Sequence, residues 1–492
     1  MRILYIDIDT LRPDHLGCYG YHRNTSPNID RLAMEGVRFD NCYVSDSPCL
    51  PSRAALYSGK CGIRNGAINH GGAAADPVIE SATRGFKTLE DNFVVRLREA
   101  GMYPVTVSPF GERHSSFWFY NGFREMYNPG RSGAETADEV IPAALEWLDR
   151  KGTTANWYLH VNVWDPHTPY RVPKNIPNPF ENEPPPGWMT EEIRRTTWDT
   201  YGPGSAQEPG GDFLGTHTAE QMGAAKQIDS MAAYKSWIDG YDHGIHYADQ
   251  HVGQLLAKLE QLNVLHDTMI IVSSDHGENF GELAVYGDHQ TADHITNRVP
   301  LIIRHPKGLG GRGRVDRALH YQFDFAATVL DMLGQDSPES WDAESFLRSL
   351  ECEREGGRNF LVVSNCAWSC QRAVRWDRYI LIRTYHSGLH NWPDVMLFDV
   401  ENDPHELTNL ASERPELVHQ GLAKLESWVT DEMRRSTEAV DPLWAVMREG
   451  GPFHANFGSP SYATYSQRLR DTGREQYADD LEQRRNRLMF KP

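Results

Sequence analysis

The sequence predicts an α/β protein that carries a smaller α+β subdomain at its C-terminal end. Residues 3–9 and 269–273 are nearly continuous apolar runs, as expected of strands buried in a parallel sheet, and helical segments lie between such strands. Residues 373–383 instead alternate apolar and polar side chains, which is typical of an antiparallel sheet with one face in solvent. We therefore expect an α/β domain over residues 1–357 and, over residues 358–492, a subdomain with a small antiparallel sheet, a helix and a tail.

Length and composition are those of a globular protein. A chain of 492 residues normally divides into two domains. No apolar run is long enough to cross a membrane, and the formal charge of −19 argues against a nucleic-acid binder, because neutralising phosphates requires a basic surface. The odd number of cysteines, seven, predicts mostly reduced thiols. The acidic N-terminal run fits a first strand rather than a signal peptide, so we expect a cytoplasmic protein.

The order of the remaining elements follows from periodicity and from glycine and proline positions. Helices are expected at residues 28–36, 88–100, 136–149, 229–262, 326–333 and 414–436, and further strands at residues 37–45, 103–107, 156–163, 321–324 and 395–400. Between the third strand of this series and the long fourth helix, residues 171–225 form an insertion rich in proline and glycine. Loops of this size are usually functional or disordered.

One stretch places a cysteine at the start of a helix. Leu50 precedes a proline and is biased toward extended backbone, whereas Pro51 fits the first turn of a helix that Gly59 can end. Cys49 therefore lies at a helix N-terminus with Arg53 just inside, and free N–H groups, the helix dipole and the guanidinium make a positive pocket. A nucleophile here would meet a tetrahedral oxyanion such as sulfate or phosphate. The alternative is a buried free cysteine beside a helix cap.

Carboxylates and an imidazole follow two of the expected buried strands. Asp9 is the last residue of the strand at 3–9, and Asp275 and His276 stand side by side after the strand at 269–273. The carboxyl ends of the strands of an open α/β sheet are where ligands bind. Hard oxygens and one imidazole are suitable ligands for a divalent cation. The alternative for Asp275 and His276 is an acid–histidine pair that hydrogen-bonds to nearby backbone.

Several motifs in the same order resemble those of the sulfatase family. They are the Cys-x-Pro-Ser-Arg signature at residues 49–53, the N-terminal run at residues 9–20, the Pro-His-x-Pro-Tyr segment at residues 166–170 and the Asp-His pair at residues 275–276. The resemblance covers roughly residues 1–430 and implies an alkaline-phosphatase-like sandwich, with helices on both faces of a large mixed sheet. It also implies a formylglycine-dependent (type I) enzyme, in which a maturation enzyme oxidises Cys49 to formylglycine.

The resemblance also assigns roles to individual residues. One divalent metal, with Ca²⁺ as the expected ion and Mn²⁺ or Mg²⁺ as alternatives, is implied to be held by Asp9, Cys49, Asp275 and His276. The implied catalytic residues are Cys49, Arg53, His114, His167 and His289. The hydrated aldehyde at position 49 would attack sulfur while Arg53 stabilises the charge on sulfate. His167 or His289 would protonate the leaving alcohol, and His114 would take the proton that lets the aldehyde re-form.

The chain departs from the family pattern at three positions. Thr10 replaces a second aspartate, which reduces the expected number of metal ligands. Glu112 and Asp288 stand where the family usually has lysines, although Arg113 can replace the first of them. Sulfate is therefore expected to be held by the metal, by histidines, by Arg53 and by Arg113.

Three further features bear on the substrate pocket. Trp188 and Trp198, in the insertion, are expected to stack against sugar rings, with a purely anchoring role as the alternative. The charged and aromatic tail, residues 440–492, is expected to cover the pocket or a partner subunit. His70 is expected to be an ordinary loop histidine, with a place in the pocket as the alternative.

These features predict a sulfuric ester hydrolase that releases inorganic sulfate from a sulfated organic substrate. The missing lysines and the tryptophans of the insertion point to a sulfated sugar, as a small molecule or an oligosaccharide, handled inside the cell. Two alternatives stay open: a phosphonate or phosphate ester hydrolase on the same scaffold, and a non-catalytic anion- or glycan-binding protein with an unconverted cysteine. A homo-oligomer is an open possibility, whereas neither a nucleic acid nor a membrane is an expected partner.

Overall fold

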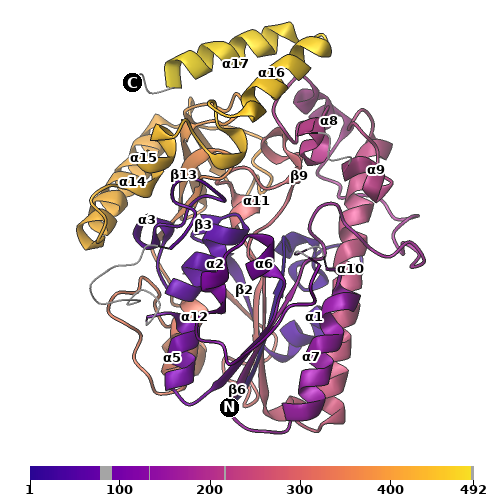
Figure 1. Cartoon of the computed structure of the whole chain (residues 1–492), viewed down its shortest axis with the longest axis vertical. Helices are drawn as coiled ribbons and strands as arrows, with labels where there is room; N and C mark the ends of the chain where they lie inside the picture. The colour runs from indigo at the N-terminus through magenta and orange to yellow at the C-terminus, as the bar shows by residue number, and fades with distance from the viewer. Residues whose placement is uncertain (78–90, 132, 134, 215–217, 489–492) are drawn as a thin grey trace.

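A large mixed sheet forms the centre of the protein. The computed structural model describes residues 1–77, 91–131, 133, 135–214 and 218–488. The strands of the main sheet are β1 (Arg2–Ile8), β2 (Val37–Tyr43), β4 (Tyr103–Val107), β5 (Glu125–Tyr127), β6 (Trp157–Val163), β7 (Thr268–Ser273), β10 (Leu301–Arg304) and β11 (Arg314–Tyr321). They lie in the order β11-β2-β10-β7-β1-β6-β4-β5 (Figure 1). Only β10 runs antiparallel to its neighbours, β2 and β7, so the sheet is mixed.

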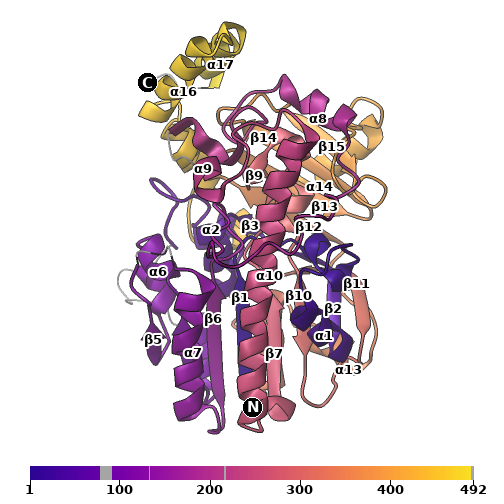
Figure 2. The same ribbon diagram turned by 90° about the vertical axis from the view of Figure 1, so that its right-hand side faces the viewer.

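Strand β1 illustrates why both faces of this sheet are covered. Ile3 and Tyr5 belong to one buried apolar cluster and Leu4 and Ile6 to another, because successive side chains of a strand point to opposite faces. The first cluster includes side chains of α2 (Cys49–Ser58), α5 (Phe93–Glu99) and α12 (Asp324–Met332), and the second includes those of α1 (Pro27–Glu35), α7 (Ala137–Lys151) and α10 (Met231–Gln261). Figure 1 shows these two helical layers on either side of the strands, and Figure 2 shows α7 and α10 in front of them, which confirms the predicted architecture.

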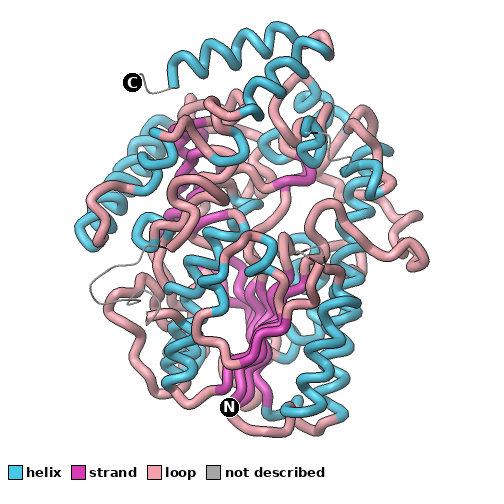
Figure 3. The backbone as a smooth tube through the Cα atoms, viewed as in Figure 1, coloured by secondary structure: helices cyan, strands magenta, loops and turns pink. Residues whose placement is uncertain are grey.

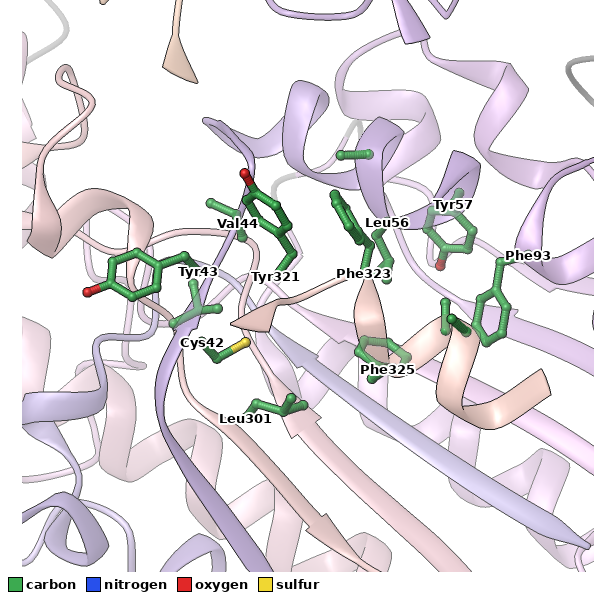
Figure 4. Close-up of a cluster of buried hydrophobic side chains, with 14 of the residues drawn as sticks. Cys42, Tyr43, Val44, Leu56, Tyr57, Phe93, Leu301, Tyr321, Phe323 and Phe325 are labelled. Atoms are coloured by element: carbon green, nitrogen blue, oxygen red, sulfur yellow. The ribbon is translucent and has the colours of Figure 1, made fainter. Parts of the chain in front are cut away.

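Helix α2 is embedded in the first of these clusters. All of its residues are buried, and Gly59, with φ of 64°, ends it as expected. Figure 4 shows Leu56 and Tyr57 of this helix near Phe93 of α5 and Phe325 of α12. A helix that is packed on all sides has a fixed position, so its first residue is held rigidly with respect to the sheet.

A second sheet supports the approach to α2. Its strands are β3 (Asp46–Ser47), β12 (Phe360–Asn365), β13 (Cys370–Trp376), β14 (Tyr379–His386) and β15 (Val395–Asp399), in the order β15-β14-β13-β12-β3. Helix α14 (Pro415–Arg435) packs against it through Leu425. The apolar–polar stretch at 373–383 forms two strands, which meet at a turn where Asp377 has φ of 46°. Because β3 directly precedes Cys49, this sheet fixes the start of α2, while the domain boundary near residue 357 stays a prediction.

The insertion and the tail lie against each other. The insertion contains α8 (Glu191–Trp198) and α9 (Thr218–Met222), and the tail contains α15 (Pro442–Arg448), the short helix η7 (Phe453–Ala455), α16 (Pro460–Asp471) and α17 (Glu475–Leu488). Buried Glu208 of the insertion accepts hydrogen bonds from the Tyr465 hydroxyl at 2.9 Å and from Nη2 of Arg474 at 2.6 Å. Figure 1 shows α16 and α17 at the end of the molecule opposite the N-terminus.

Loops and helices dominate the half of the molecule above the main sheet. Figure 3 shows the strands of that sheet grouped below, with long connections above them. Most of the expected elements are found within a few residues of their expected ends, α10 at 231–261 among them. Within the described residues, no helix combines the length and apolar composition that crossing a membrane requires.

Candidate active site

The ends of two neighbouring strands meet the start of α2. Strands β1 and β7 pair in parallel, so the residues that follow them, Asp9 and Asp275 with His276, lie at the same edge of the sheet. Sγ of Cys49, the first residue of α2, lies 3.1 Å from Nε2 of His276. One ligand atom from each of these four buried residues lies within 4.8 Å of the others. The structure therefore brings the expected metal ligands together, although their role as ligands stays a prediction.

The protonation state and the hydrogen bonds of these side chains are suitable for binding a cation. Nδ1 of His276 lies 2.9 Å from the carbonyl oxygen of Gly277, which leaves Nε2 directed at the cluster. Burial lowers the pKa of His276 to about 3, so the ring is neutral and Nε2 has the lone pair that a metal ligand needs. Oδ1 of Asp9 is buried and has no hydrogen-bond partner among the described residues. These donors form a suitable ligand set for a divalent metal ion.

Arg53 is surrounded by carboxylates. Its Nη2 lies 3.0 Å from Oδ2 of Asp7 and 3.4 Å from Oδ2 of Asp9, and its Nη1 pairs with Asp275. Arg113 Nη1 contacts Asp9 Oδ2 at 3.0 Å. Two guanidinium groups thus face three buried carboxylates, and the negative charge in excess is a second feature that fits a bound cation. Asp7, which the sequence left without a definite role, supports Arg53.

Two of the three departures from the family pattern, Thr10 and Glu112, have distinct structural outcomes. The Thr10 hydroxyl donates to the carbonyl oxygen of Asp9, while its backbone N–H donates to Oδ1 of Asp275 at 3.2 Å. Thr10 therefore orients a candidate ligand through its backbone. Glu112 is exposed and accepts a hydrogen bond from Asn128, away from the cluster. Its neighbour, Arg113, points inward instead, as its contact with Asp9 shows.

A cavity of about 570 Å³ opens beside Cys49. Its lining includes the predicted site residues Arg113, His114, His167 and His289, the departure Asp288, and four residues without a predicted place there, His70, Trp164, Trp368 and His454. The cavity lies within the size range of small-molecule sites. The cavity is therefore lined by both the expected nucleophile, Cys49, and the imidazoles that are expected to transfer protons.

The predicted histidines differ in charge. Burial keeps the pKa of His114 and His167 well below the usual value, so both are neutral. Nδ1 of His167 lies 2.7 Å from the Thr168 carbonyl oxygen, which leaves its other nitrogen for the cavity. Burial also disfavours the charged form of His289, but the carboxyl group of Glu278, 3.8 Å away, helps to raise its pKa to about 9. The site therefore holds neutral and protonated imidazoles side by side, as acid–base catalysis requires.

Sequence reasoning misplaced the aromatic walls of the cavity. Trp188 stacks on His405, with ring centroids 4.0 Å apart, and neither it nor Trp198 is among the described residues that line the cavity. The expectation that they meet the substrate is therefore wrong, because a loop without periodicity gives no direction for its side chains. Trp164 and Trp368 line the cavity instead. Trp164 directly follows β6, and Trp368 lies between β12 and β13. Proximity to strand ends was therefore the only feature of the sequence that could have placed them in the cavity.

Two further histidines of the cavity had no motif. His70 lines it rather than being an ordinary loop histidine, so the expectation for His70 is wrong and its alternative holds. His454, in η7 of the tail, lies beside it, with Nε2 3.0 Å from Nδ1 of His70. The expectation that the tail reaches the pocket is met by this residue. In the sequence, the tail is marked only by its charged and aromatic composition, and no pattern singles out His454.

Comparison with known families identifies two matching models. A model described as Sulfatase matches residues 2–335, and one described as N-sulphoglucosamine sulphohydrolase, C-terminal, matches residues 281–430. Among curated relatives, the N-acetylglucosamine-6-O-sulfatase of Bacteroides thetaiotaomicron is 24% identical over 469 residues, which cover 83% of this chain and 82% of the relative.

Solved structures show the same fold at low sequence identity. A protein solved in complex with its substrate D-glucosamine-2-N,6-O-disulfate has a TM-score of 0.68 at 19% identity, covering 90% of this chain and 99% of its own. A phosphonate monoester hydrolase from Silicibacter pomeroyi has a TM-score of 0.63, also at 19% identity, covering 90% of this chain and 97% of its own. Both likenesses concern the fold, which extends over nine-tenths of the chain.

Proposed function

This chain belongs to the sulfatase family and is a sulfuric ester hydrolase, and from this premise we propose that it removes sulfate from a sulfated sugar by means of a formylglycine made from Cys49. One observation carries the proposal: Cys49 begins a buried helix 3.1 Å from His276, inside a cluster of carboxylates and guanidinium groups. A simple thiol there has no second hydroxyl with which to expel sulfate after the transfer. A hydrated aldehyde has one, so each turnover returns the residue to its starting state.

The metal proposal rests on the donor set. Asp9, Asp275, His276 and the modified residue at position 49 would hold one divalent cation, and the hard oxygens favour Ca²⁺ over the alternatives Mn²⁺ and Mg²⁺. The cation would draw electron density from the sulfuryl oxygens. Treatment with a chelator should abolish sulfate release and lower the melting temperature, because an ion that binds the folded state stabilises it. Adding back single ions should identify the one that restores both; an unchanged melting temperature would contradict the assignment.

The side chains around position 49 divide the remaining work. Arg113 carries the positive charge that the family usually supplies with a lysine, and Arg53 of the Cys-x-Pro-Ser-Arg signature contacts the same carboxylate, so we assign both to the sulfate oxygens. The ester S–O bond breaks as the hydroxyl at position 49 bonds to sulfur, and protonated His289 gives a proton to the leaving alcohol. The proton that the attacking hydroxyl loses passes to the unprotonated, cavity-facing nitrogen of neutral His167. Their rings lie 5.3 Å apart and both face the cavity. His114 then takes the proton of the remaining hydroxyl, so that sulfate leaves.

Sulfated sugar is the substrate class that the cavity supports best. Trp164 and Trp368 give the cavity aromatic surface against which a pyranose can pack, and a volume of about 570 Å³ accommodates a small saccharide. The relative named N-acetylglucosamine-6-O-sulfatase and the disulfated glucosamine complex are consistent with this class. A maturation enzyme, a homo-oligomeric state and a cytoplasmic location stay predictions.

Matched esters test the reaction. Converted protein should release sulfate from N-acetylglucosamine 6-sulfate and from 4-nitrophenyl sulfate, and should act far more slowly on 4-nitrophenyl phosphate. Faster release of phosphate would favour the phosphate or phosphonate ester hydrolase, a reaction known on this fold from the Silicibacter pomeroyi enzyme. Binding of the sulfated sugar without any turnover would favour the non-catalytic alternative.

A further inference from the structure

We propose that the C-terminal tail completes the substrate site: His454, together with His70 and Trp368, forms a subsite for hydroxyl groups of the sugar that carries the sulfate. The inference rests on the proposed function and adds a place where the uncharged part of the substrate binds. The two family models match residues up to 335 and 430, so His454 lies beyond both. The residues that the two family models match therefore do not include His454.

A tight turn brings the tail to the cavity. After α15, Gly450 and Gly451 have φ of 103° and 114°, values that favour glycine. A side chain on Gly451 would also collide with the ring of His386, whose Nε2 lies 2.6 Å from the position of an added Cβ. The chain then enters η7, where the backbone N–H of His454 donates to the carbonyl oxygen of Ala367 at 3.0 Å. Backbone conformation and a backbone hydrogen bond thus hold the tail in place, independently of the side chains of the subsite.

Asn69 connects the tail to the loop that carries His70. Its Oδ1 accepts hydrogen bonds from the backbone N–H of His70 at 2.9 Å and from that of Phe453 at 3.2 Å. The side chain is buried, so these bonds are protected from water. The loop and the tail are held in one fixed relation, and their two imidazoles meet as a consequence.

The imidazoles form an ordered polar surface. The His454 ring stacks on Trp368, with centroids 4.5 Å apart and planes 23° apart, while its Nε2 lies 3.0 Å from Nδ1 of His70. The His70 ring in turn lies 5.1 Å from that of His114. The remaining nitrogen of His70, Nε2, is buried and has no hydrogen-bond partner among the described residues. A buried polar atom at a cavity wall normally meets a ligand or water.

The chemistry of this surface favours hydroxyl groups. Burial lowers the pKa of His70 and His454, the latter to about 4, so near neutral pH both rings are uncharged. The contact between them uses one nitrogen of each ring and leaves the pair with one donor and one acceptor for a ligand. Such a pair matches hydroxyls, which also donate and accept. Trp164 and Asp288 line the same cavity and add aromatic surface and a carboxylate acceptor. A pyranose ring satisfies all of these groups, whereas a simple aryl group meets only the aromatic ones.

The insertion fixes the tail from the other side. Glu208 binds Tyr465 and Arg474 of the tail, and Gly210, two residues further along, lines the same cavity. The apolar cluster around Tyr201 and Phe457 continues this contact. The subsite is therefore supported by two segments that both reach the substrate cavity.

Two substrates separate sugar recognition from sulfate chemistry. We would compare His454→Ala, His70→Ala and the double variant on N-acetylglucosamine 6-sulfate and on 4-nitrophenyl sulfate. Each single variant should lower kcat/KM for the sugar about 10-fold, mainly through KM, since a lost hydrogen bond typically costs that much. The aryl ester should change less than about twofold. The double variant should lose less than the product of the single losses, because the two rings contact each other.

Matched variants control for folding. His454→Gln keeps a donor and an acceptor and should retain more sugar activity than His454→Ala. Trp444→Ala removes an exposed aromatic side chain from the same tail, outside the cavity, and should leave both substrates unaffected.

The possible results are distinguishable. If the His454 variants lowered kcat/KM equally for both esters, His454 would act on the general structure of the site, and the proposed subsite would be overturned. So would wild-type protein that hydrolyses the aryl sulfate but no sugar sulfate. If wild-type protein, with residue 49 converted, released sulfate from neither ester, the proposed function itself would fail, and the subsite with it.

Discussion

The floor and the wall of the substrate cavity are built in different ways. The floor is charged and buried: Cys49 lines the cavity, and Arg53, Asp9 and Asp275 form the buried cluster around Cys49. Its groups are fixed by the central sheet, so little can move without cost to the core. We assign the sulfate group of the substrate to this part of the site.

The wall is neutral and is assembled from distant segments. His70 comes from the loop after the short helix α3 (Gly62–Asn65), Trp368 from the connection between β12 and β13, and His454 from the tail, so contacts across several hundred residues bring them together. The comparison teaches that reaction and recognition can be separated in this protein. Changes in the floor should affect all substrates alike, whereas changes in the wall should affect only those with groups that the wall can bind.

The largest effect is expected at the nucleophile. Cys49→Ala removes the proposed formylglycine precursor, and sulfate release should fall by roughly 10⁴-fold or more for every ester, as for other lost nucleophiles. Cys352→Ala, at an exposed cysteine, should retain full activity. Steady-state assays on the sugar and aryl sulfates would measure both. Appreciable turnover by Cys49→Ala would show that the floor does not supply the nucleophile, and would contradict the division of reaction and recognition between floor and wall.

Arg53→Ala tests the charge balance of the floor. It leaves the carboxylates of Asp7, Asp9 and Asp275 without their shared cation, and removing one member of a buried ion pair costs about 3–5 kcal/mol. Urea denaturation should show this loss, and activity on both esters should fall together. Arg434→Ala, at a side chain that is 75% exposed, should change stability by less than about 0.5 kcal/mol. A stable Arg53→Ala variant would contradict the account of the floor.

The floor was largely predictable from sequence, and the wall was not. Asp9, Asp275 and Cys49 follow apolar strands or begin a helix, and local rules place such residues at one edge of a sheet. His454 is about 400 residues from Cys49 in sequence, and nothing in its surroundings predicts the contact with His70. Tertiary packing alone determines that kind of site.

The fold shows the same division. The helices and strands of the main sheet followed from periodicity, because each buries one continuous apolar face. The strand β3, two residues long, and the short helix η7 have no periodic signal, yet they position Cys49 and His454. The insertion tryptophans were assigned to the substrate because composition shows that a side chain is aromatic but not where it points.

Glu208→Ala should loosen the wall without touching the floor. The buried carboxylate holds Tyr465 and Arg474, so its loss should raise hydrogen exchange over residues 453–488. Activity on the sugar sulfate should fall about 10-fold, whereas that on the aryl sulfate should stay within about twofold. Glu482→Ala, an exposed glutamate of α17, is the matched control. Equal losses on both esters would show that wall and floor are coupled.

The smallest effect is a pH dependence of tail docking. The pKa of His454 is lowered by burial, and by the nearby charge of His289, to about 4 in the folded state, against about 6.5 for an unperturbed histidine. Between these values the unfolded state binds more protons, so this residue reduces stability as the pH falls from about 6.5 to 4. His454→Gln should show a shallower loss of stability across that window in urea denaturation. An identical slope in both proteins would mean that His454 is not buried in the docked tail.

Peptide mass spectrometry across Cys49, on protein from its native host, tests the central claim most directly. The account predicts that the peptide containing residues 49–53 has the lower mass of an aldehyde in place of the thiol, and that activity tracks the converted fraction. Protein that is fully active with an intact thiol at position 49 would contradict the proposed chemistry of the floor.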